Sequence, residues 1–273
     1  MFSVGYRDGM DQQPVVEYYG LGLEQERLAA GSSAVEFART KELLERFLPP
    51  SPASVLDIGG GPGAYASWLA DLGYRVHLID PVPLHLEQAT ALARDRFTAA
   101  RGDARELSQR DREWDAVLML GPLYHLTERD QRLRALREAR RVLRPGGLLA
   151  AAAISRFASL LHGLIHDALG DPAFDSIVER DLHEGQHRNP TDRPDWFTKA
   201  YFHHPDELRI EVDEAGLVLE GIFGIEGPGW VLGDRLDQSE VRERAVRVAR
   251  AVEQEPTMLG SSGHLLVVAR RPA

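Results

Sequence analysis

The sequence predicts an α/β fold built on a mostly parallel, doubly wound sheet. Short apolar runs alternate with amphipathic segments between residues 54 and 154. The runs have the length of strands that are buried on both faces, and the segments between them have the period of helices. A glycine-rich turn separates the first run from the first of these helical segments, as it does in sheets that bind ligands at their carboxyl edge.

The elements follow one another in a regular order. Residues 14–48 are predicted to be helical, because apolar side chains recur on one face until Pro49, Pro50 and Pro52 end the pattern. Strands are predicted at 54–58, 75–79, 97–100, 114–120 and 148–153, with helices at 65–72, after Pro83 and at 128–143. Together these segments form the alternation that is typical of a parallel sheet covered by helices.

The pattern is weaker after residue 154. A helix is expected at 157–169, and a polar stretch follows it up to residue 204. A helix at 206–215, a strand at 217–225, a helix at 239–252 and an edge strand at 264–269 complete the chain. We therefore expect an N-terminal helical lid (1–50) and one domain (51–273) that carries a lid insertion at about 155–204.

Composition limits the classes of function. The 273 residues include 32 basic and 42 acidic side chains, so the formal net charge is -10, which disfavours nucleic acid as a partner. The chain has no cysteine, which excludes disulfides, thiolate metal sites and cysteine nucleophiles. No signal peptide is visible, and the most apolar run is shorter than the roughly 20 residues of a membrane span. We expect a cytoplasmic monomer or homodimer without a membrane partner.

The glycine-rich turn reads Asp57-Ile-Gly59-Gly60-Gly61-Pro62-Gly63. Glycines at this position let the backbone turn sharply and approach a ligand closely. Read as Gly59-x-Gly61-x-x-Ala64, with Asp80 at the end of the next strand, the turn also matches a dinucleotide fingerprint. An NAD(P)-dependent oxidoreductase and a non-catalytic cofactor-binding protein therefore remain alternatives.

Three acidic residues lie near the ends of successive predicted strands at equal spacing. Asp80 follows Asp57 by 23 residues (80 − 57), and Asp103 follows Asp80 by 23 (103 − 80). With Gly102-Asp103-Ala104-Arg105, Trp114-Asp115-Ala116-Val117 and Val142-Leu143-Arg144-Pro145-Gly146-Gly147, this pattern resembles the ordered motifs of class I S-adenosylmethionine-dependent methyltransferases over about residues 55–154. An oxidoreductase would leave Asp103 and the Arg-Pro-Gly-Gly turn without a role.

The resemblance implies a Rossmann-like, seven-stranded sheet and S-adenosylmethionine as the cofactor. It also implies methyl transfer to a small-molecule acceptor, with secondary metabolism as a setting and with nitrogen, oxygen and carbon open as the acceptor atom. Within it, Asp80 would hold the ribose hydroxyls and Asp103 the adenine amino group. The candidate cofactor contacts are Asp57, Gly59, Gly60, Gly61, Asp80, Asp103, Ala104, Leu120 and Gly121, joined by Tyr19 and Arg39, beside Tyr18 and Arg27, from the N-terminal helices.

The loop after the fourth predicted strand reads Gly121-Pro122-Leu123-Tyr124-His125. It resembles the place where amino-methyltransferases of nucleobases carry Asn or Asp before Pro-Pro-Tyr. Gly121 offers no side chain to accept a hydrogen bond from a base amine, which argues against nucleobase methylation. His125 is the candidate general base or substrate orienter, and Tyr124 the candidate stacking group. Both side chains could equally serve the structure, as a helix cap and as packing.

The stretch from His183 to His187 formally matches H-E-x-x-H, a zinc-site signature that requires a continuous helix. Gly185 interrupts such a helix and Asn189-Pro190 ends it, so we interpret the match as chance and expect no metal. The segment is predicted instead to form part of a lid over the acceptor. Its candidate acceptor contacts are His187, Arg188, Asn189, Tyr201, His203 and His204.

Overall fold

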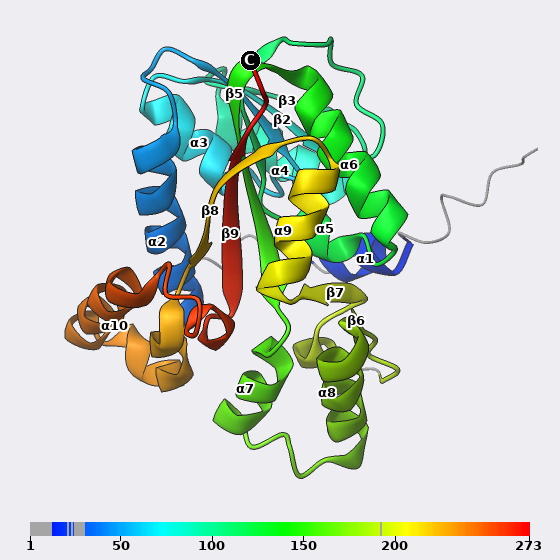
Figure 1. Cartoon of the computed structure of the whole chain (residues 1–273), viewed down its shortest axis with the longest axis vertical. Helices are drawn as coiled ribbons and strands as arrows, with labels where there is room; N and C mark the ends of the chain where they lie inside the picture. The colour runs from blue at the N-terminus through cyan, green and yellow to red at the C-terminus, as the bar shows by residue number, and fades with distance from the viewer. Residues whose placement is uncertain (1–12, 21, 23, 25–30, 192) are drawn as a thin grey trace, which may run out of the picture.

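The computed structural model describes residues 13–20, 22, 24, 31–191 and 193–273, and it confirms the predicted fold class (Figure 1). The parallel strands are β1 (Ser54–Ile58), β2 (Arg75–Asp80), β3 (Thr98–Arg101), β4 (Trp114–Met119) and β5 (Leu143–Ser155), in the spatial order β3-β2-β1-β4-β5. The sheet continues from β5 to β9 (His264–Arg270) and then to β8 (Val218–Gly224). Strand β9 runs antiparallel to both of its neighbours.

The prediction that residues 264–269 form an edge strand is wrong. Strand β9 pairs with β5 from Leu148↔Arg270 to Ile154↔His264, and β8 covers its other side. Its central residues, 265–269, are all buried, as expected of an apolar strand inside a sheet.

The sheet also exceeds the seven predicted strands. The short strand β7 (Ala200–His203) pairs with β5 at Ile154 and Ser155, and β6 (Gln186–His187) pairs with β7. These two strands extend the sheet because β5 continues past the end of β4, which leaves its last residues available for pairing.

Helices cover both faces of the sheet (Figure 1). On one face lie α2 (Gly31–Phe47), α3 (Ala64–Asp71) and α4 (Pro83–Ala93), and on the other α6 (Arg129–Val142) and α9 (Pro205–Glu214). The short helix α5 (Pro122–His125) follows β4. Near the end of the chain, α10 (Ser239–Val252) packs beside the 3₁₀ segment η3 (Gly227–Asp237). A short 3₁₀ turn, η4 (Leu259–Ser261), precedes β9. Among the described residues, no helix combines the length and the apolar character needed to span a membrane.

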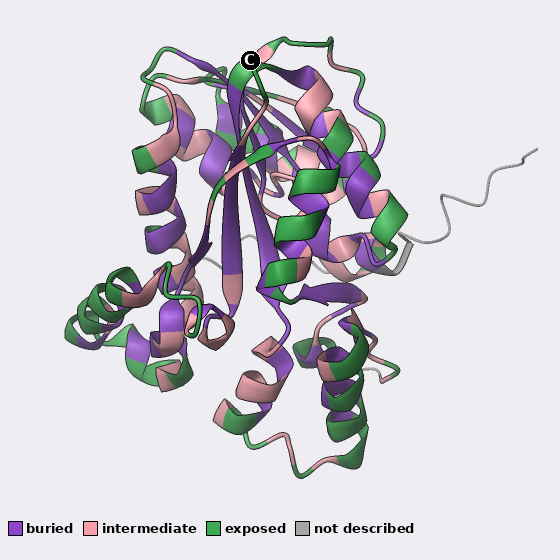
Figure 2. Cartoon of the chain, viewed as in Figure 1, coloured by how far each residue is buried: buried purple, intermediate pink, exposed green. Residues whose placement is uncertain are grey.

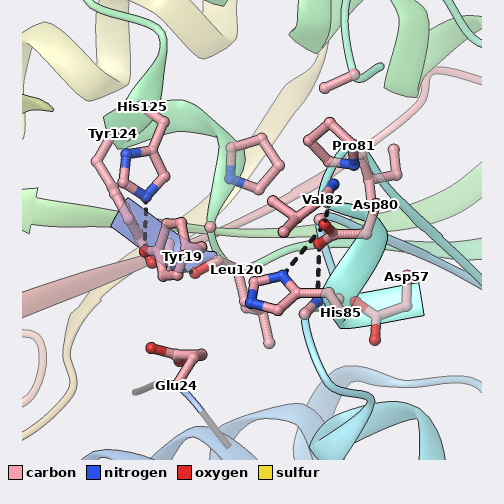
Figure 3. A pocket seen from close by; sticks show the side chains of 18 of the residues that line it. Tyr19, Glu24, Asp57, Asp80, Pro81, Val82, His85, Leu120, Tyr124 and His125 are labelled. Carbon is pink, nitrogen blue, oxygen red and sulfur yellow. Dashed lines mark hydrogen bonds and ion pairs between the residues drawn. The ribbon is translucent and has the colours of Figure 1, made fainter. Parts of the chain in front are cut away.

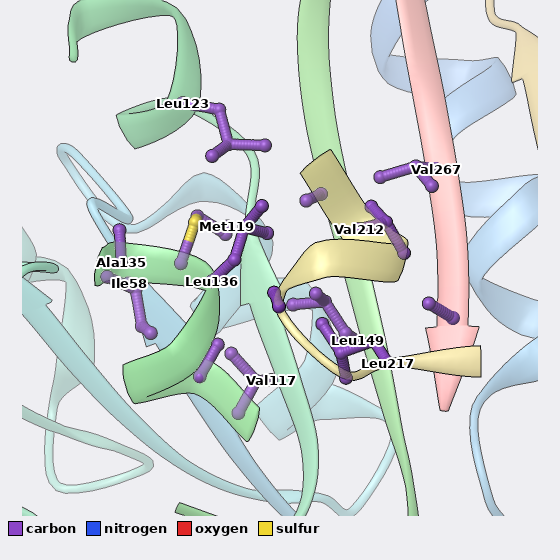
Figure 4. Packing of buried hydrophobic residues seen from close by; sticks show 14 of the residues in the cluster. Ile58, Val117, Met119, Leu123, Ala135, Leu136, Leu149, Val212, Leu217 and Val267 are labelled. Atoms are coloured by element: carbon purple, nitrogen blue, oxygen red, sulfur yellow. The ribbon is translucent and has the colours of Figure 1, made fainter. Parts of the chain in front are cut away.

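The core consists of two apolar layers, one on each side of the sheet. Because side chains alternate along a strand, Val117 and Met119 of β4 lie in one layer while Ala116 and Leu118 lie in the other. Figure 4 shows the first layer, in which Val117 and Met119 share a cluster with Leu136 of α6. The strands are buried along most of their length, and exposed residues gather on the outer faces of the helices (Figure 2).

The segment from residue 155 to 204 lies beyond the carboxyl end of β5 (Figure 1). It contains α7 (Ala158–Ile165), α8 (Pro172–Glu184), β6, the 3₁₀ turn η2 (Pro194–Trp196) and β7. Sequence reasoning missed α8, although Phe174, Ile177 and Val178 form a helical stripe that packs on Trp196, and Asp171 caps the helix by accepting from the amide of Ala173. The acidic and basic residues of 179–184 obscured that stripe.

Two N-terminal helices, α1 (Gln13–Tyr19) and α2, occupy the described part of the segment that was predicted to be helical. Arg27, one of the basic residues considered for the cofactor, lies outside the described residues.

Candidate active site

Two adjoining cavities lie at the carboxyl edge of the sheet. The first has a volume of about 140 Å³ and lies where β1, β2 and β4 end (Figure 3). Because parallel strands end at the same edge, residues that are distant in sequence meet there. Of the predicted site residues it is lined by Tyr19, Asp57, Gly59, Gly60, Gly61, Asp80, Asp103, Ala104, Leu120, Gly121, Tyr124 and His125.

The glycine loop is held against the end of β2. The amide of Gly59 donates to the carbonyl of Ile79 at 2.7 Å, and the amide of Gly61 donates to Asp80 Oδ2 at 3.0 Å. At Gly60 any side chain would collide with the wall, because a Cβ atom there would lie 2.5 Å from Asp57 Oδ2. The loop therefore brings bare backbone to the cavity, bonds to the carboxylate of Asp80 and packs closely against that of Asp57.

Asp80 is 3% exposed and anchors this edge of the cavity. Its Oδ1 atom accepts from the amide of Val82 at 2.9 Å and lies 3.2 Å from His85 Nδ1. Figure 3 shows the His85 ring beside Asp80 within the cavity. His85 Nε2 is buried and has no hydrogen-bond partner among the described residues. Sequence reasoning missed His85, and the available signal was its position in the first turn of the helix after β2.

Asp57 carries a second buried polar atom without a partner. The residue is 1% exposed, and its Oδ2 atom accepts no hydrogen bond from the part of the chain that the structure describes. Burial, with a smaller contribution from the charge of Asp80, raises the pKa of Asp57 to about 7. A ligand that presents a cation or a hydrogen-bond donor here would stabilise the ionised carboxylate.

Asp103 enters the cavity as an ionised carboxylate. The guanidinium of Arg105 donates from Nε to Oδ1 at 3.0 Å and to Oδ2 at 3.3 Å, and from Nη2 to Oδ2 at 2.7 Å, while the Arg105 amide donates to Oδ1 at 2.8 Å. Burial acts to raise the pKa of Asp103, but the bonds from Arg105 outweigh it and hold that pKa below its ordinary value. A carboxylate fixed in this way presents its remaining lone pairs in a defined direction.

His125 connects three parts of the structure. Its Nε2 atom lies 2.8 Å from the hydroxyl of Tyr19, and its Nδ1 atom lies 3.4 Å from the carbonyl of Lys199. Burial lowers the pKa of His125 to about 4, despite the opposing effects of the Lys199 carbonyl and Asp80. The imidazole is thus neutral near pH 7. Because a group with so low a pKa accepts a proton weakly, His125 suits an orienting role better than that of a general base. The neighbouring Tyr124 hydroxyl donates to the carbonyl of Leu120 at 3.2 Å.

Arg39 does not line the cavity, contrary to the sequence-based expectation. It is fully buried and pairs with Glu253 and Glu42, and its Nε atom donates to the carbonyl of Ile225. Successive helical residues project about 100° apart, so Arg39 of α2 points toward α10 while Thr40 faces the cavity. Its guanidinium therefore joins α2 to the C-terminal part of the chain.

The second cavity has a volume of about 310 Å³ and shares Tyr19, Glu24, Glu36 and Tyr124 with the first. Its remaining wall comes mainly from the insertion, from η3 and from the start of β9. Sequence reasoning missed most of this wall, which includes Glu36, Ser159, His162, Trp196, Phe197, Glu226, Trp230 and His264. No local signal marks them, because they come from segments that meet only in the folded chain.

Of the predicted acceptor contacts only His187 lines this cavity. Both of its ring nitrogens are engaged, Nδ1 with Asp181 Oδ2 at 2.8 Å and Nε2 with the carbonyl of Trp196 at 2.9 Å. The side chains of Arg188 and Asn189 bond within their own loop. The insertion thus uses these polar groups to hold itself together.

The other three predicted contacts also have structural partners. Tyr201 stacks on the guanidinium of Arg132 at 3.7 Å, and His203 Nε2 lies 3.3 Å from Glu211 Oε2 in the same buried network. His204 caps α9 by accepting from the amide of Asp206. The prediction relied on residue type alone. In the structure these side chains contact other groups of the protein and do not line the second cavity.

The H-E-x-x-H match does not form a helical site. Gly185 adopts a left-handed backbone conformation with φ 69° and ends α8 after Glu184. His183 therefore belongs to the helix and His187 to strand β6, so the two rings do not share a helix face.

Comparison with known proteins identifies the family. A family model described as a methyltransferase domain matches residues 55–147. An uncharacterized methyltransferase of Mycobacterium tuberculosis is 28% identical over 243 residues, which cover 86% of this chain and 90% of that protein. The chain is a class I S-adenosylmethionine-dependent methyltransferase. The methyltransferase GfsG of Streptomyces halstedii is 36% identical to it over 121 residues, 42% of each chain.

Solved structures agree on the fold of this methyltransferase. A crystal structure described as a SAM-dependent methyltransferase from Methanosarcina mazei superimposes with a TM-score of 0.59 at 18% identity, covering 84% of this chain and 97% of that one. S-adenosylmethionine is the cofactor, and the first cavity fits its chemistry. Its ammonium and ribose hydroxyls are donors, and the cavity presents the unpaired Asp57 Oδ2 together with Asp80.

Proposed function

We propose that this methyltransferase transfers the methyl group of S-adenosylmethionine to a small molecule held in the second cavity. The observation that carries the proposal is that the two cavities adjoin, since Tyr19, Glu24, Glu36 and Tyr124 line both of them. Methyl transfer requires nucleophile, methyl carbon and sulfur to lie in line, so cofactor and acceptor must occupy adjoining sites. Secondary metabolism is the setting that we propose for the reaction.

Within the first cavity, the proposed cofactor contacts follow the strand ends. Asp80 accepts from the ribose hydroxyls, and Asp103 with the backbone at Ala104 reads the adenine. The glycine loop and Asp57 face the methionyl part, while Leu120 and Gly121 flank the methyl group. This arrangement is supported by the position of every one of these residues on the wall of one cavity.

The cofactor supplies an electrophilic methyl group on a positively charged sulfur. The protein's part is to hold the acceptor against it and to exclude water. Tyr19 and Tyr124 line both cavities, and there they would orient the acceptor toward the methyl group of the cofactor. Neutral His125 holds the Tyr19 hydroxyl in place. We propose that α1, whose Val15, Val16 and Tyr19 line the first cavity, and the insertion (155–204) act as lids over the two cavities, whereas most of α2 covers a face of the sheet. We propose a monomer or homodimer as the working unit.

Calorimetric titration with S-adenosylmethionine, S-adenosylhomocysteine and NADH tests the cofactor assignment. We expect micromolar binding of the two adenosyl compounds and no heat from NADH. A screen of small acceptors with mass detection of a methyl group then tests the transfer. NADH binding without binding of the adenosyl compounds would overturn the proposal in favour of an oxidoreductase.

A further inference from the structure

We propose that the second cavity selects an acceptor that carries a protonated amine on an aromatic or other apolar frame. The inference rests on the proposed function, because it specifies the class of small molecule that this cavity takes. It comes from the cavity's charge, from a fixed carboxylate beside an indole ring, and from an unpaired buried hydroxyl.

Apart from the tyrosines, the ionisable side chains of the wall are carboxylates and histidines, with Glu226 paired to His264 and Asp195 to Arg193. Four carboxylates line the second cavity, from Glu24, Glu36, Asp195 and Glu226, and no lysine or arginine lines it among the described residues. Aromatic rings supply much of the remaining wall, from Tyr18, Tyr19, Tyr124, Phe174, Trp196, Phe197, Phe202 and Trp230. A cavity lined in this way attracts cations and disfavours anions, while its rings offer contact to an apolar body.

Glu226 is the best-defined of these carboxylates. It is 3% exposed, its Oε2 atom accepts from Ser262 Oγ at 2.8 Å and from the amide of His264 at 2.9 Å, and its Oε1 atom lies 2.5 Å from His264 Nδ1. Glu36, Glu226 and His264 each place one side-chain N or O atom within 4.8 Å of the others. The carboxylate group is therefore fixed by its neighbours, and Glu36 adds a second negative charge at the junction with the cofactor cavity.

An indole ring lies beside this carboxylate. A Cβ atom added to Gly263 would lie 3.6 Å from ring atoms of Trp230 and 3.7 Å from Glu226 Oε1, so a methyl-sized group at this glycine would contact both. The indole Nε1 of Trp230 donates to the carbonyl of Ser261 at 2.9 Å, which fixes the ring. A carboxylate and an aromatic face that converge on one space form a typical ammonium site.

Ser159 provides an independent indication of a ligand. Its hydroxyl lines the same cavity, the residue is 5% exposed, and Oγ has no hydrogen-bond partner within the described chain. A buried hydroxyl without a partner is costly, so a polar atom of the acceptor is its natural partner. The cavity thus recognises an amine at Glu226 and a second polar group at Ser159.

The test is a calorimetric titration of the full chain, both free and saturated with S-adenosylhomocysteine. Three probes share one frame and differ in charge: phenethylamine, phenethyl alcohol and hydrocinnamate. We expect phenethylamine to bind about tenfold or more tightly than the alcohol, because the ammonium gains a charge-assisted hydrogen bond, and we expect no binding of hydrocinnamate. Equal binding of the three probes, or preference for hydrocinnamate, would overturn the proposal.

Variants locate the binding. Glu226→Gln keeps the shape of the side chain and should weaken phenethylamine binding about tenfold while leaving S-adenosylhomocysteine affinity unchanged. Glu36→Gln is a second variant, which keeps the test decisive if Glu226→Gln fails to fold. Glu220→Gln is the matched control, since that carboxylate is on β8 and pairs with Arg270 away from both cavities.

Two further outcomes separate the possible failures. Tight Mn²⁺ binding that Glu226→Gln abolishes, without amine binding, would make Glu36, Glu226 and His264 a metal site and overturn the proposal. Absence of S-adenosylhomocysteine binding would instead contradict the cofactor assignment. In that case the titrations of the free protein with the three probes still show whether the second cavity prefers an amine.

Discussion

The Tyr19 hydroxyl lies 2.8 Å from His125 Nε2, and this contact joins α1 to the short helix α5 that follows β4. The other ring nitrogen of His125 faces the carbonyl of Lys199 in the insertion. One imidazole thus connects both proposed lids to the end of a central strand. The Tyr19 ring also contacts the His85 ring, with centroids 5.2 Å apart, at the cofactor cavity.

Tyr19→Phe removes this hydroxyl and keeps the ring. We expect S-adenosylhomocysteine to bind about fivefold more weakly, because one hydrogen bond that holds α1 over the cavity is worth about 1 kcal/mol. Calorimetry measures the change. Tyr18→Phe is the matched control, since Tyr18 is on the same helix but does not line the first cavity. Equal effects of the two substitutions would show that the contact with His125 has no part in cofactor binding.

Asp57 should make stability depend on pH. Its folded-state pKa of about 7 is above its ordinary value of 3.8, so the folded protein keeps a proton that the unfolded chain releases. The free energy of unfolding should therefore fall as the pH rises from about 4 to about 7 through this group. Asp57→Asn removes that contribution, so the variant should gain stability relative to the wild type between pH 5 and pH 8.

Urea unfolding of both proteins without cofactor, at pH 5 and at pH 8, measures the difference in unfolding free energy between the variant and the wild type. Both proteins carry the same remaining titratable groups, which makes the wild type the control for the variant. Parallel pH profiles for the two proteins would contradict the raised pKa of Asp57.

Asp80→Ala should weaken S-adenosylhomocysteine binding about tenfold or more, since losing a hydrogen bond to a charged group costs about 1.5–3 kcal/mol. Asp80 also accepts from the Gly61 amide, so part of the loss would come from a loosened glycine loop. Asp111→Ala provides a control, because that carboxylate pairs with Arg141 outside both cavities. Unchanged affinity in folded Asp80→Ala would rule out the ribose assignment.

The buried pair of Arg132 and Glu211 should be a determinant of stability. Arg132 Nη2 lies 2.6 Å from Glu211 Oε1, and the two side chains are almost fully buried between α6 and α9. Glu211→Ala should cost about 3–5 kcal/mol of unfolding free energy, because it leaves the guanidinium buried without its counter-charge. Chemical denaturation measures the loss.

A matched control exists between the same two helices. Arg129 and Glu214 form an ion pair whose side chains are 46% and 44% exposed, and Glu214→Ala should cost at most about 1 kcal/mol. Similar losses of unfolding free energy for Glu211→Ala and Glu214→Ala would contradict the expectation that the buried ion pair contributes more to stability than the exposed one. Tyr201 and His203 belong to the buried network, so their substitution should also lower stability.

The sheet and the first cavity could be predicted from the sequence. Strands buried on both faces need continuous apolar runs, and parallel strands end at one edge, so Asp57, Asp80 and Asp103 were bound to meet once their runs were recognised. The place of β9 could not be predicted, because its apolar run would suit more than one position in a sheet.

The sequence alone did not decide which groups the polar side chains contact. Arg39 and Glu36 lie three residues apart on α2, yet one pairs with Glu253 and the other lines the cavities. His203 has the residue type of a ligand contact and is buried against Glu211 instead.

By itself, then, the sequence determined the parallel strands β1 to β5, the glycine loop and the acidic residues near the ends of the first three strands, because these depend on local periodicity and backbone direction. Only the tertiary structure brought Glu36, Glu226 and His264 together, since they come from α2, from the turn after β8 and from the start of β9. Their proximity depends on long-range pairing of β8 with β9 and on packing of α2, which no local pattern encodes.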